Sequence, residues 1–101
     1  MSVSENLLNE IKNNVDITWA LSEDEKNKLS GMISRGMQSL KDKIGFCDFE
    51  SDTQEKSLLI NYVRYDRAGA LSDFWVNYKG EIISLSLRNK VKEYEEENAD
   101  I

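Results

Sequence analysis

The chain has 101 residues, of which 40% are hydrophobic and 32% are charged, and its formal net charge is −6 at pH 7. This length fits one domain with a modest core. The acidic balance argues against a nucleic-acid-binding surface, because contacts with phosphates need clustered Lys and Arg. Cys47 is the single cysteine and no long apolar run is present, so we expect no disulfide, no membrane span and a soluble protein made in a cytoplasm.

Apolar residues at helical spacing predict a first short helix over residues 5–14, with Ser4 as its N-cap. The pattern breaks over residues 16–21. The absence of proline and the small number of glycines favour long helices in the rest of the chain.

A second helix is predicted to begin after Ser22, which has capping-box spacing to Glu25, and to end at about Ile44 before a C-cap at Gly45. Gly36 lies inside the apolar stripe of this helix, where glycine costs about 1 kcal/mol relative to alanine. We therefore expect another helix to approach closely at Gly36. The stripe consists of Leu29, Ile33, Met37, Leu40 and Ile44.

The stretch over residues 54–78 is predicted to form one long central helix of about seven turns. A helix with two apolar faces must be covered from two directions. One face has cover available from the rest of the chain and consists of Leu59, Ile60, Val63, Ala70, Leu71, Phe74 and Tyr78. The other has less cover, so it is predicted to meet a neighbouring subunit, and it consists of Leu58, Tyr62, Tyr65 and Val76.

Residues 81–87 have spacing compatible with a helix or a strand, and we favour a helix over 81–86. The acidic segment over 87–101 is predicted to be a mobile or weakly helical tail. The sequence therefore predicts an all-α fold, a small bundle of three to four helices around the central helix. Residues 1–86 form the single domain in this prediction.

The chain lacks the residues that most often carry catalysis. It contains no histidine, the commonest general base and metal ligand, and Cys47 has no His partner for thiol chemistry. The acids at 23–25 and 93–97 fit a helix start and a solvated segment better than a calcium loop. We therefore predict no catalytic, cofactor-binding or metal site and no enzymatic activity.

Arg67 allows two interpretations. Its stem could pack on the core while its guanidinium reaches water. Alternatively, Arg67 could pair with a carboxylate across a subunit interface, for which arginine is well suited. The second interpretation adds Arg67 to the predicted subunit-interface residues.

Several short segments together form a pattern of helix faces and aromatics. They are LLNEIK at 7–12, RG at 35–36, DFE at 48–50, LLINYVRYD at 58–66, AL at 70–71, Phe74, NY at 77–78 and EIISL at 81–85. This pattern resembles that of the small head–tail connector proteins of long-tailed bacteriophages and related prophages. The resemblance covers roughly residues 7–86 and contains no chemical motif.

The resemblance implies an all-helical virion protein at the head–tail junction. Such adaptors form a ring of about a dozen copies under the portal, extend the DNA channel and provide the platform for a stopper or tail completion protein. DNA passes through the channel without sequence-specific binding. The isolated protein is expected to be a monomer or weak oligomer, and its acidic end is expected to order on the portal. The portal-docking candidates are Tyr94, Glu95, Glu96 and Glu97.

The alternative hypothesis is a small helical interaction or regulatory module, similar to an antitoxin and unrelated to virions. Such a module would mask its partner through the same two-faced helix. The position of the gene discriminates between the two hypotheses, because a connector gene lies between capsid and tail genes and a regulatory gene lies beside a toxin or repressor gene.

Overall fold

The computed structural model describes residues 3–98, and it describes side chains as far as residue 96. This part of the chain is entirely helical, without a strand, which confirms the predicted all-α class. The number of helices is five instead of the expected three to four, because the expected central helix is divided in two. The helices are α1 (Glu5–Asn14), α2 (Glu23–Ile44), α3 (Gln54–Arg67), α4 (Leu71–Asn77) and α5 (Lys79–Asn98).

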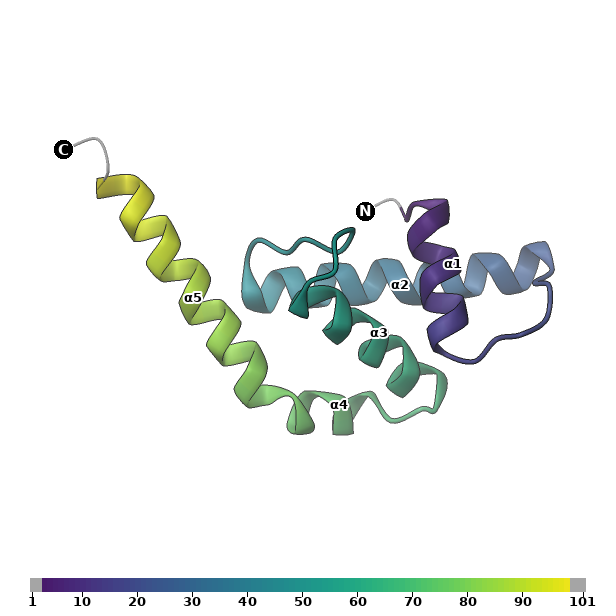
Figure 1. The fold of residues 1–101 in the computed structure, drawn as a ribbon. Coiled ribbons are helices and arrows are strands. Elements are labelled where there is room, and N and C mark those ends of the chain that lie inside the picture. The colour runs from purple at the N-terminus through teal and green to yellow at the C-terminus, as the bar shows by residue number, and fades with distance from the viewer. Residues whose placement is uncertain (1–2, 99–101) are drawn as a thin grey trace.

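Helix α2 is the platform of the fold. It packs against α1, α3 and α5, while α4 connects α3 to α5 and packs against both. In Figure 1, α1 crosses α2, and the second half of α5 extends away from the other helices. All five helices contribute buried apolar side chains to one core, so the described chain is a single bundle.

The boundaries of α2 follow the local signals in its sequence. The hydroxyl of Ser22 accepts a hydrogen bond from the Glu25 N–H, and the Glu25 carboxylate accepts one from the Ser22 N–H, so the predicted capping box is present. Gly45 ends the helix with a φ of 96°. All five residues of the predicted stripe are buried.

The close approach expected at Gly36 is also present. A Cβ added to Gly36 would lie 2.7 Å from Cδ1 of Tyr62 and 2.8 Å from Cδ1 of Leu59. These distances leave no room for a methyl group, so glycine allows α3 to pack directly on the backbone of α2.

The prediction of one continuous helix over 54–78 is wrong. The N–H of Gly69 donates to the Asp66 carbonyl (3.0 Å), and the N–H of Ala70 donates to the Tyr65 carbonyl (2.8 Å). This bond pattern, with Gly69 at a φ of 70°, is a Schellman motif that ends α3. The turn lets α4 fold back on α3, which buries Phe74 edge-on to Tyr65 at a centroid distance of 5.7 Å. The burial of the Phe74 ring against α3 favours this interruption of the helix, and the N–H groups of Ala68, Gly69 and Ala70 all still have acceptors at the turn.

The helix favoured over 81–86 is confirmed, and it is longer than expected. α5 continues to Asn98, through most of the segment that was predicted to be a separate mobile tail. Its middle is attached to the bundle, because Arg88 pairs with Glu55 (2.7 Å) and the Asn89 amide donates to the carbonyls of Ile44 and Phe46 (3.0 Å each). Residues 99–101 of the predicted tail lie outside the described residues.

Candidate functional site

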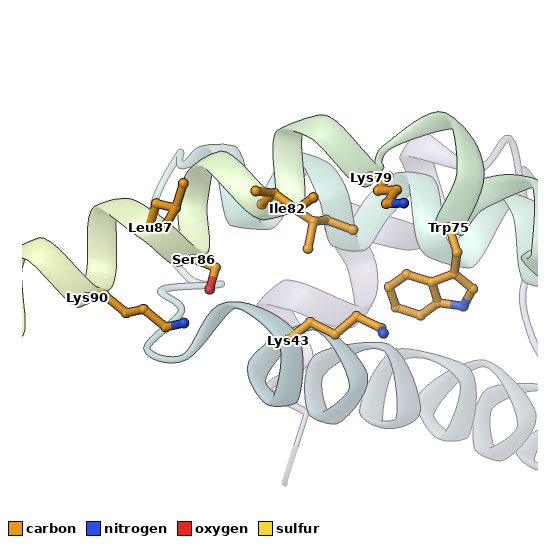
Figure 2. Close-up of a pocket in the computed structure, with 8 residues that line it drawn as sticks. Lys43, Trp75, Lys79, Ile82, Ser86, Leu87 and Lys90 are labelled. Carbon is orange, nitrogen blue, oxygen red and sulfur yellow. The ribbon is translucent and has the colours of Figure 1, made fainter.

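A groove of about 530 Å³ lies where the end of α2, α4 and the first half of α5 meet. Figure 2 shows Trp75 and Lys79 at one end, Leu87 and Lys90 at the other, and Lys43 on the opposite helix. Its volume is within the range of about 300–1,000 Å³ that ligand pockets occupy. The groove is lined by Lys43, Trp75, Lys79, Ile82, Ile83, Ser86, Leu87 and Lys90.

Helical spacing explains why α5 presents one side to this groove. Lys79, Ile83, Leu87 and Lys90 follow one another at intervals of three or four residues, so they share a face. Ile82 is buried and fixes α5 on the bundle beside that face. The turn before α4 is equally important, because it brings Trp75 next to the end of α2.

Lys43 connects α2 to the aromatic wall of the groove. Its Nζ lies 5.0 Å from the centroid of the Trp75 ring, within the distance for a cation–π interaction. Trp75 in turn packs edge-on against Phe74 at 5.0 Å and Tyr62 at 5.9 Å. Packing against these two core rings therefore fixes the position of Trp75 in the groove.

The groove is a basic site on an acidic protein. Lys43, Lys79 and Lys90 surround its apolar floor, whereas the chain as a whole has a net charge of −6. Within the described side chains, no salt bridge neutralises any of these three ammonium groups. The arrangement can therefore bind a group that combines an apolar body with negative charge.

An exposed apolar stripe continues from the groove along α5. Its residues are 49–68% exposed, and they are spaced by three or four residues, so they lie on one face of the helix. The buried Ile82 and Leu85 lie on the side of α5 that packs on the bundle. The stripe consists of Ile83, Leu87, Val91 and Tyr94.

The predicted subunit-interface residues do not form one exposed face. Leu58 and Tyr62 are buried within the single chain, so the expectation that they lie at its surface is wrong. The physical reason is that α3 is covered from more than one side, since Tyr62 packs on α2 at Gly36 and also against Phe74 and Trp75 of α4. Tyr65 is half-buried and its hydroxyl is 3.1 Å from the Asn77 amide, whereas Val76 is 74% exposed.

Arg67 has a role inside the chain that neither interpretation anticipated. Its Nη1 donates to the Val15 carbonyl (2.8 Å), and the neighbouring Arg64 donates to the Asn14 carbonyl. Both arginines therefore satisfy carbonyl groups at the C-terminal end of α1, where cations are favoured by the helix dipole. A contact of Tyr65, Arg67 and Val76 with a neighbouring subunit remains a prediction.

The portal-docking candidates lie near the projecting end of α5. Tyr94, Glu95 and Glu96 are exposed. The side chain of Glu97 lies outside the described side chains. Docking of these residues on a portal remains a prediction.

In residues 3–98, no group of three or more His, Cys, Asp or Glu side chains is placed to hold a metal ion. None of the helices in that range is long and apolar enough to cross a membrane. Burial and the nearby Glu55 carboxylate raise the pKa of the Cys47 thiol to about 11.

Sequence reasoning missed the groove. The spacing of Lys79, Ile83, Leu87 and Lys90 was a usable signal for a shared face. No sequence signal placed Lys43 beside that face, since its position depends on how α2 and α5 pack. No protein-family model, curated protein or solved structure matches this chain.

Proposed function

We propose that this protein is a structural adaptor that acts by binding other proteins and not by catalysis. The proposal is based on the exposed apolar stripe of α5. This stripe begins at the basic groove and continues along the part of the helix that projects from the bundle. Contiguous apolar surface with a charged rim is typical of protein–protein interfaces.

The stripe is not needed to hold the bundle together. Ile82 and Leu85 already provide the buried face of α5, and Arg88 and Asn89 fasten its middle to other helices. Leu87 and Val91 remain more than half exposed. Covering them with a partner would remove apolar surface from water, with a gain of roughly 25 cal/mol per Å².

Within this class, we propose the function of a head–tail connector. The protein would form a ring under the portal, extend the DNA channel and provide the docking platform for stopper or tail completion proteins. Support comes from the all-helical fold and from two surfaces of different character on one molecule, because heterologous contacts between unlike surfaces generate rings. The net charge of −6 supports passage of DNA without binding to the wall.

Electron microscopy of the protein mixed with the portal of the same virus tests this function. We expect additional ring-shaped density at the base of the portal, and no such density with portal alone. Leu87→Asp places a charge in the middle of the apolar stripe and is expected to abolish the added ring, whereas Ser57→Asp, on the exposed side of α3, is expected to retain it. A portal that remains unchanged by the wild-type protein would contradict the connector function.

A further inference from the structure

We propose that the groove between α2, α4 and α5 binds the acidic end of α5 from a second copy of this chain. The inference rests on the proposed function, in that copies of the protein assemble with one another.

Charge complementarity is the first argument. Lys43, Lys79 and Lys90 give the groove three positive charges. After Lys92, the rest of α5 carries four negative charges and no positive one. The carboxylates are those of Glu93, Glu95, Glu96 and Glu97, and the first three, whose side chains are described, are exposed.

The apolar parts of the two surfaces also match. Val91 and Tyr94 lie three residues apart on α5, so they project from one face, with Glu95 beside it and Glu93 and Glu96 farther around the helix. The groove offers Trp75, Ile83 and Leu87 as an apolar floor. Its volume of about 530 Å³ is large enough to receive an aromatic and an aliphatic side chain together.

The occupant must come from another molecule. Leu87 of the groove and Tyr94 of the acidic end belong to the same straight helix, seven residues apart, which corresponds to about 10 Å along its axis. A straight helix cannot bring two of its own residues into contact when they are that far apart along its axis. The end of α5 therefore reaches a groove only on a second copy.

The contact joins two different patches, so each copy has one groove and one acidic end to offer. Successive contacts then extend the assembly from copy to copy, and they close into a ring if the rotation permits. In this arrangement the end of α5 binds the neighbouring copy. Portal docking, which the sequence assigned to the same residues, then requires another surface.

Two charge-neutralising variants and their mixture test the contact. Each changes three exposed residues and should leave the helical circular dichroism spectrum unchanged. The groove variant carries Lys43→Gln, Lys79→Gln and Lys90→Gln. The end variant carries Glu93→Gln, Glu95→Gln and Glu96→Gln. A control variant neutralises three carboxylates elsewhere and carries Glu23→Gln, Asp24→Asn and Asp52→Asn.

Sedimentation velocity is measured at protein concentrations up to about 1 mM. We expect the wild type and the control variant to self-associate, and each test variant to associate at least about tenfold more weakly. An equimolar mixture of the groove variant and the end variant should associate again, because it restores one intact groove and one intact end. A monomeric wild type, test variants that associate like the wild type, or a mixture that stays monomeric would overturn the proposal.

A crosslink gives the geometry of the contact. Leu87→Cys and Tyr94→Cys are combined in one chain with Cys47→Ser. Within one helix these positions are about 10 Å apart, beyond the Cα separation of about 7 Å that a disulfide can bridge. We therefore expect oxidation to join different molecules through a disulfide between position 87 of one and position 94 of the other. A fully monomeric product would contradict the contact.

The outcomes also separate this inference from the proposed function. Charge-dependent association of the wild type into closed dimers would support the contact and count against a ring. A ring on the portal that forms equally well with the groove variant would support the connector and overturn the contact.

Discussion

Gly36→Ala and Gly31→Ala make the same chemical change in one helix, and the structure predicts opposite results. At Gly31 an added Cβ would meet only Nη1 of Arg35, at 3.3 Å, and that flexible side chain can move away. At Gly36 the Cβ would lie 2.7 Å from the ring of Tyr62 and 2.8 Å from Leu59, both of which are buried.

The magnitude follows from two opposing contributions. Replacing a helical glycine by alanine stabilises a helix by about 0.5–1 kcal/mol, and Gly31→Ala should show this gain. Gly36→Ala makes the same gain but loses about 1–3 kcal/mol to overpacking, because Tyr62 and Leu59 cannot move without disturbing the core. The free energies of unfolding of the two variants should therefore differ by about 1–3 kcal/mol, with Gly36→Ala the less stable.

Urea unfolding followed by circular dichroism at 222 nm measures this difference. The midpoint should rise for Gly31→Ala and fall for Gly36→Ala, with an unchanged m-value for both. In thermal unfolding, each kcal/mol corresponds to about 4–8 °C for a domain of this size. If Gly36→Ala were as stable as Gly31→Ala, the close packing of α3 on α2 at this point would be refuted.

Three further predictions concern individual side chains. Phe74→Ala should lower the free energy of unfolding by about 3–5 kcal/mol, because Phe74 is fully buried between other aromatic rings. Ser22→Ala should lower it by about 1 kcal/mol through loss of the capping box, again measured by urea unfolding. Cys47, with a pKa of about 11, should have on the order of 100-fold less thiolate at pH 8 than an ordinary cysteine, so iodoacetamide should alkylate the native protein far more slowly than the urea-unfolded chain.

Each of these three predictions would be contradicted by a specific result. A Phe74→Ala variant with nearly wild-type stability would show that α4 does not contribute to the core. Full stability of Ser22→Ala would mean that the start of α2 is held by other contacts. Because a raised pKa keeps the thiol protonated, the alkylation rate of native Cys47 should increase as the pH rises toward 11, and a rate independent of pH would contradict the burial described for it.

The features of α2 could be predicted because their causes are local. The Ser22–Glu25 pair, the apolar period and Gly45 act over at most a few turns of helix, and all three are present in the structure. Gly36 was informative for the same reason, since its cost inside a stripe implied a close neighbour.

The division of the central helix could not be predicted from the same signals. A single glycine in a helical pattern costs only about 1 kcal/mol, so Gly69 did not require a break. The decisive contribution is the burial of Phe74 against α3, which depends on tertiary packing. The same turn places Phe74 and Trp75 against Tyr62, which also packs on α2, and it brings Trp75 to the groove.

The projecting half of α5 has a consequence for the thermodynamics of any contact that it makes. No described side chain from Lys90 to the end is buried, so this half is held mainly by its own backbone bonds. Helical segments of that length are marginal in water, and a partner that binds the helical form must supply the entropy lost on ordering it. The affinity of the acidic end should therefore depend on its intrinsic helix propensity as well as on the residues that touch the partner. Solvent-facing substitutions that favour or disfavour helix would tune assembly without altering the contact itself.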